Sequence, residues 1–127
     1  MIQVSCAIIE QEGRVLLAQR SPGMRHPLCW EFPGGKLLPD ESPDAAIVRE
    51  IREELAMEVQ PLEQLPAVQH DYGDIHIHLI PIRCRWLGGA PVLAEHLQIR
   101  WLEPRQARQL DLAAADQKVL ELYLTHI

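Results

Sequence analysis

The stretch "GGKLLPDESPDAAIVREIREELAM", residues 34–57, leads from a glycine turn into an acidic segment with helical periodicity. Ser42 followed by Pro43 predicts a helix start, because Ser caps free backbone amides and Pro fits the first helical position. Apolar residues then recur at helical spacing, which provides one side for packing on a sheet. We expect this helix to end near Ala56.

Three carboxylates share one side of the predicted helix. Glu50 precedes Glu53 by three positions and Glu54 by four, and like charges at this spacing weaken a bare helix by roughly a few tenths of a kcal/mol. A bridging divalent cation would make the same arrangement favourable, and hard oxygen ligands suit Mg²⁺ or Mn²⁺. The alternative is a merely solvated acidic face, which the helix alone would favour. The glycine turn and Glu41 shift the balance towards a metal site.

The composition narrows the class of protein. The chain has 127 residues and a net charge of −6, which fits one domain, residues 1–127, and argues against a broad basic surface for nucleic acid polymers. The cysteines are odd in number and lack a CxxC pair, so we expect reduced thiols. The N-terminus shows no signal peptide and no membrane-spanning run. We expect a cytoplasmic protein, monomeric and without a membrane partner.

Strands and helices mix along the rest of the chain. Residues 2–9 and 14–20 predict a β-hairpin, and the later segments predict strands at residues 59–70, 75–87 and 97–102. A short helix is expected after Pro104, and an amphipathic helix over residues 113–126. The economical arrangement is an α/β sandwich with a mixed sheet between helices.

The spacing Gly35-x5-Glu41-x7-Arg49-Glu50-Ile51-x-Glu53-Glu54 resembles the Nudix box, G-x5-E-x7-R-E-U-x-E-E-x-G-U, where U is a bulky aliphatic residue. Ala56 departs from it, because the family has Gly there. The segments "LLAQR" and "WEFPGGK" further resemble the MutT-type branch. The resemblance implies an α/β/α sandwich with a central mixed sheet, and a nucleoside triphosphate pyrophosphohydrolase that uses Mg²⁺ or Mn²⁺.

The resemblance also implies roles for individual residues. Glu53 and Glu54 resemble metal ligands, and Glu50 a general base or a further ligand. A backbone carbonyl of Gly34 or Gly35 and the distant Glu95 would complete the metal shell. Arg49 would orient the glutamates through salt bridges that include Glu41. Arg20 would contact a phosphate. A solvated loop residue at position 95 and an exposed strand-end Arg at position 20 remain equal alternatives.

The base preference stays open between two classes. The resemblance assigns base or substrate contacts to Glu31, Phe32, His78 and Asp116, although His78 could also lie on a half-buried strand, with a zinc site less favoured. An ionised Asp116 offers only acceptors, which suits the two adjacent donors of guanine and ranks 8-oxo-dGTP first. CTP or 5-methyl-dCTP is a close second, but cytosine would require a protonated Asp116 or a protonated ring.

Other functions remain as alternatives. A different Nudix substrate, such as ADP-ribose, a nucleotide sugar or a dinucleoside polyphosphate, would bring additional markers that we do not find. A catalytically inactive nucleotide-binding module would be expected to have lost the box glutamates, and Glu50, Glu53 and Glu54 are intact.

Overall fold

The computed structural model describes residues 1–127. Its core is an eight-stranded mixed sheet with the path β3-β2-β1-β7-β5, to which β4 adds beside β1, β6 beside β7 and β8 beside β2. Only β1 and β7 run parallel, and the other pairs are antiparallel. The strands are β1 (Ile2–Gln11), β2 (Arg14–Gln19), β3 (Trp30–Glu31), β4 (Gly34–Lys36), β5 (Glu58–Gln64), β6 (Val68–Asp71), β7 (His76–Gly88) and β8 (Gln98–Leu102).

The expected first hairpin is confirmed. Its two turn residues, Glu12 and Gly13, have φ angles of 51° and 76°. Positive φ at both central residues gives a turn whose twist matches that of the flanking strands. The expected strand over residues 59–70 is instead two strands, β5 and β6, which both pair with β7. Pro66 lies in the break between them, since it lacks the amide that a ladder requires.

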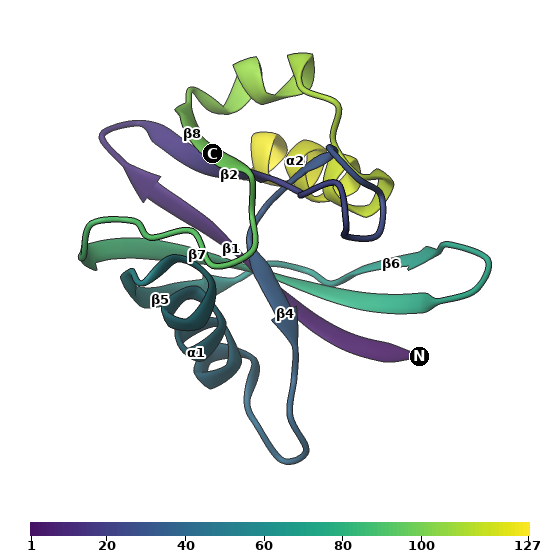
Figure 1. The fold of residues 1–127 in the computed structure, drawn as a ribbon. Coiled ribbons are helices and arrows are strands. Elements are labelled where there is room, and N and C mark those ends of the chain that lie inside the picture. Colours follow the sequence, from purple (N-terminus) through teal and green to yellow (C-terminus); the bar gives the residue numbers. More distant parts are fainter.

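The helices cover opposite faces of the sheet, so the predicted α/β/α sandwich is confirmed (Figure 1). Helix α1 (Pro43–Leu55) packs through Ile47, Ile51 and Leu55 on one face. On the other face lie α2 (Ala114–His126), through Val119 and Leu120, and the 3-10 helix η1 (Pro104–Gln109), through Ala107. Residues alternate between the two cores along the central strands: on β1, Cys6 and Ile8 face α2, whereas Ala7 and Ile9 face α1.

Candidate active site

Helix α1 begins and ends where the sequence predicts. The Ser42 hydroxyl accepts the Ala45 amide at 3.1 Å, and Pro43 is the first helical residue. At the other end Ala56 is left-handed, with φ 55° and ψ 29°, and its amide donates to the Arg52 carbonyl at 3.0 Å. The chain therefore keeps the backbone geometry of a glycine cap although its residue is Ala, which carries a steric cost of about 1 kcal/mol.

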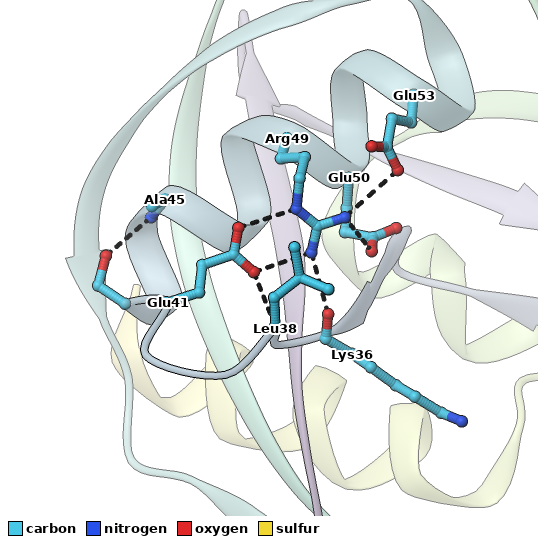
Figure 2. Close-up of polar contacts among 8 residues, drawn as sticks. Lys36, Leu38, Glu41, Ala45, Arg49, Glu50 and Glu53 are labelled. Atoms are coloured by element: carbon cyan, nitrogen blue, oxygen red, sulfur yellow. Dashed lines mark hydrogen bonds and ion pairs between the residues drawn. The ribbon is translucent and has the colours of Figure 1, made fainter.

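Arg49 ties the turn after β4 to the helix (Figure 2). Its guanidinium contacts Glu41 through Nε at 2.8 Å and Nη2 at 2.9 Å, and Nη2 also donates to the Lys36 carbonyl at 3.1 Å. From the same group, Nη1 lies 2.9 Å from Glu50 and 3.3 Å from Glu53. One arginine thus orients two of the three helix carboxylates. The predicted contact between Arg49 and Glu41 is present.

Gly34 and Gly35 lie where an added side chain would meet other atoms. A Cβ atom on Gly34 would lie 2.0 Å from the Ser5 carbonyl oxygen of β1, and one on Gly35 would lie 2.4 Å from Cδ of Glu50. Both glycines therefore permit close approaches: the first to the neighbouring strand, the second to a carboxylate of α1. This brings the backbone of β4 directly against the acidic side of the helix.

Glu54 is the most confined carboxylate of the helix. Its side chain is 11% exposed, whereas that of Glu53 is 60% exposed. Burial, together with the facing carboxylates of Glu31, Glu50 and Glu95, raises the pKa of Glu54 to about 9. Several acidic groups from distant segments therefore meet at one end of α1.

Glu95 reaches this site through the loop between β7 and β8. The loop is fastened to α1, because Val92 donates to the Leu55 carbonyl at 2.9 Å and Ala94 to the Glu54 carbonyl at 3.1 Å. The Ser21 hydroxyl donates to the carbonyl of Glu95 from the opposite side. These bonds also satisfy carbonyls that the end of a helix leaves free.

A cavity of about 260 Å³ runs from the acidic end of α1 towards the start of α2. We call it the main cavity. It is lined by eight of the residues that the sequence assigned to metal or substrate: Arg20, Glu31, Phe32, Gly34, Gly35, Glu54, Glu95 and Asp116. Arg20 Nη1 lies 2.6 Å from Glu31, so these two form an ion pair in the wall.

Asp116 lies on the α2 side of the main cavity and is 7% exposed. Its Oδ1 accepts the Phe32 amide at 2.9 Å. Burial raises the pKa of Asp116 well above its usual range, the charge of Glu31 adds to the rise, and the hydrogen bond from Phe32 opposes it. The carboxyl group therefore keeps its proton above the pH at which an exposed Asp would lose it.

The structure does not bring His78 to the other expected site residues, so its role as a substrate contact stays a prediction. Ile77 and Leu79 line the main cavity, and His78 does not. Side chains alternate along a strand, and the register of β7 on β1 turns residues 77 and 79 towards α2. Sequence analysis also missed His96, whose side chain lies between Glu31 and Glu54. Its only sequence signal is its place next to Glu95.

The carboxylate oxygens gathered around Glu54 are the kind of ligand that a divalent cation prefers. Glu54 is desolvated among other carboxylates, and a hard cation is the partner that such an oxygen cluster lacks. No three acidic, histidine or cysteine side chains are arranged to hold an ion by themselves. Mg²⁺ commonly takes only one or two carboxylates and completes its shell with water and substrate phosphates, so it does not require such a group.

Comparison with known proteins agrees with the fold and shows the family. A family model described as NUDIX domain matches residues 4–122. A CTP pyrophosphohydrolase of Escherichia coli K12 is 40% identical over 98% of this chain and 92% of its own length, and an 8-oxo-dGTP diphosphatase of Proteus vulgaris is 40% identical over 57% and 64%. The crystal structure of a MutT protein from Methanosarcina mazei Go1 superposes with a TM-score of 0.89 at 26% identity, covering 98% of this chain and 94% of that one. None of the helices combines the length and the apolar composition that a membrane span requires.

The family model over residues 4–122 and these relatives together show that the chain belongs to the Nudix family of pyrophosphohydrolases, in its MutT-type branch.

Proposed function

We propose that this Nudix hydrolase acts on a cytidine triphosphate or a cytidine derivative such as 5-methyl-dCTP, releasing the monophosphate and pyrophosphate, and that Asp116 reads the base. The observation that carries the proposal is the placement of Asp116: a buried carboxyl group in the wall of the main cavity, with one oxygen already bonded to the Phe32 amide.

A protonated Asp116 complements cytosine. The bond from Phe32 marks Oδ1 as the acceptor oxygen, which leaves Oδ2 to carry the proton and act as a donor. Cytosine presents an amine donor beside the N3 acceptor, so the pair can form two hydrogen bonds. This reverses the ranking obtained from the sequence, which assumed an ionised Asp116. The Escherichia coli relative, which is named CTP pyrophosphohydrolase, also supports ranking cytidine nucleotides before 8-oxo-dGTP.

Hydrolysis of 8-oxo-dGTP is the second candidate, supported by the Proteus vulgaris relative. Guanine presents two adjacent donors and needs an ionised carboxylate at Asp116. Such a carboxylate would be opposed by burial and by the nearby charge of Glu31. We therefore rank 8-oxo-dGTP after the cytidine nucleotides as a substrate.

The phosphates would extend from the base towards α1. Glu53 and Glu54, with a carbonyl of Gly34 or Gly35, are the proposed ligands of Mg²⁺ or Mn²⁺, and Glu95 joins them from the loop. Such a cation, when bound, offsets the triphosphate charge and activates water. Glu50, which Arg49 contacts at 2.9 Å, is the proposed general base or a further ligand. Arg20 can offer its Nη2 to a phosphate oxygen while Nη1 contacts Glu31.

The test is a panel of CTP, dCTP, 5-methyl-dCTP, dGTP and 8-oxo-dGTP, with pyrophosphate release measured in Mg²⁺ for the wild type and two variants. Asp116→Asn presents one donor and one acceptor permanently, so it should keep the preference for cytidine nucleotides. Asp116→Ala should lower kcat/KM for them by roughly 10–100-fold, because the base loses its partner.

Each other outcome has a defined meaning. A wild type that prefers 8-oxo-dGTP, together with an Asp116→Asn variant that loses this activity, would establish the second candidate. If no triphosphate on the panel is hydrolysed, the chain is an inactive nucleotide-binding module or acts on another class of substrate.

A further inference from the structure

His96 is an imidazole that the proposed mechanism does not use. It follows directly on Glu95 in the loop between β7 and β8, and its side chain is fully buried, with 0% exposed. The backbone on either side of it is fixed: Ala94 donates to the Glu54 carbonyl at 3.1 Å, and Leu97 donates to the Gln19 carbonyl at 2.9 Å. The ring therefore sits in a rigid frame built from α1 and β2.

Both nitrogens of this ring face carboxylates. Nε2 lies 2.7 Å from Oε2 of Glu31, and Nδ1 lies 3.5 Å from Oε2 of Glu54. Nδ1 is buried and makes no hydrogen bond. A buried imidazole nitrogen without a partner is unfavourable, so its position against Glu54 calls for an explanation other than packing.

The two carboxylates belong to different parts of the site. Glu31, on β3, pairs with Arg20, the residue proposed to contact a phosphate. Glu54, on α1, is a proposed metal ligand. The side chains of Arg20, Glu31, His96 and Glu54 thus form a continuous chain of contacts, in which His96 joins Glu31 to Glu54.

We propose that His96 is a positioning residue that holds the carboxylate of Glu54 in place for the cation and holds Glu31 in place against Arg20. The proposal rests on the metal assignment made under Proposed function, but not on the identity of the base. Nδ1 of His96 contacts the Glu54 carboxylate at 3.5 Å. Side chains that support a metal ligand set its orientation, and their removal typically costs about 10–100-fold in metal affinity or activity.

Two variants separate the contacts. The amide of an Asn side chain falls near the position of Nδ1, and that of a Gln side chain near Nε2. His96→Gln should therefore keep the contact with Glu31 and lose the one with Glu54, whereas His96→Asn should do the reverse. His96→Ala removes both, and His76→Ala, at an exposed position on β7, is the matched control.

The first readout is the dissociation constant of Mn²⁺ for the protein without nucleotide, measured by calorimetry. We expect the dissociation constant to rise about tenfold in His96→Ala and His96→Gln, and by less than about threefold in His96→Asn. The second is the KM for the nucleotide at saturating Mg²⁺, which should rise in His96→Asn and His96→Ala but not in His96→Gln. His76→Ala should match the wild type in both.

A purely structural role predicts a different pattern. It would lower the melting temperature of all three His96 variants in the absence of metal and leave the Mn²⁺ dissociation constant of the folded protein unchanged. Unchanged Mn²⁺ binding in His96→Gln and His96→Ala would overturn the proposal. If His96→Ala does not fold, the Gln and Asn variants decide. A wild type that binds no Mn²⁺ would instead overturn the metal assignment, and this inference with it.

Discussion

Arg49 and Glu41 face each other in a two-point ion pair, with Nε 2.8 Å from Oε2 and Nη2 2.9 Å from Oε1. Glu41 also accepts the Leu38 amide at 2.9 Å. The pair fastens the turn after β4 to the middle of α1, and so fixes the distance between the glycines and the acidic side of the helix. The spacing in the box therefore has a direct physical meaning: seven residues lie between the two members of one ion pair.

Because of this ion pair, the free energy of unfolding should depend on pH in the acidic range. Hydrogen bonds from Arg49 and from the Leu38 amide lower the pKa of Glu41 to about 2. A carboxyl group whose native pKa is lowered contributes stability above its unfolded pKa of about 4.3 and loses it as the pH falls towards 2. Glu41→Gln should therefore destabilise the protein at pH 7, with a difference that shrinks from about pH 4 downwards. Urea unfolding at several pH values measures this. A difference that stays constant with pH would contradict this expectation.

Glu54→Gln should lower kcat on the order of 10²–10³-fold, because it removes the buried charge proposed to hold the cation. Glu53→Gln should cost less, since Glu53 is largely exposed and lies at the edge of the Arg49 contacts. Steady-state rates over a range of Mg²⁺ concentrations are the measurement. A rate for Glu54→Gln within a few-fold of the wild type would remove Glu54 from the metal site.

Ala56→Gly should stabilise the protein by about 1 kcal/mol, because Ala56 has a φ of 55° and Gly adopts this conformation without the steric penalty. Ala45→Gly, at an exposed position within the same helix, should destabilise it by about 1 kcal/mol and serves as the matched substitution. Thermal and urea unfolding report both. Equal effects of the two changes would mean that the left-handed cap carries no strain.

Gly34→Ala and Gly35→Ala should fail in different ways. At Gly34 the new methyl group meets the backbone of β1, so we expect weakened pairing of β4 with β1 and a marked loss of stability. At Gly35 it meets the end of the Glu50 side chain, which can move aside. Gly35→Ala should therefore keep most of its stability and lose activity. Melting temperature and kcat, measured on both variants, separate the two effects.

Turnover of cytidine nucleotides should fall at alkaline pH in the wild type. The pKa of Asp116 is raised, so the protonated form persists above the pH at which an exposed Asp ionises and is lost as the pH rises through the native pKa. Asp116→Asn has no proton to lose, and the ratio of its kcat/KM for CTP to that of the wild type should increase with pH. The same sign holds for stability, which should decline for the wild type relative to Asp116→Asn. A ratio that does not change with pH would show that Asp116 does not act through its proton.

Local features are what the sequence by itself determined. The capped start of α1, its end at Ala56, the first hairpin and the shared side of Glu50, Glu53 and Glu54 all follow from periodicity and short-range spacing. A helix places residues three and four apart together regardless of what surrounds it. The family followed from the same stretch, because its box lies almost entirely within one turn and one helix.

Only the tertiary structure decided which groups from distant segments meet. The register of β7 on β1 turned Ile77 rather than His78 into the main cavity, and no local pattern specifies a register between strands so far apart in the chain. The position of His96 between Glu31 and Glu54 arises in the same way. The raised pKa of Asp116, and with it the proposed choice of cytosine, depends on burial and on a neighbouring charge. Both are properties of the packed molecule, because desolvation exists only once the chain has closed around the carboxyl group.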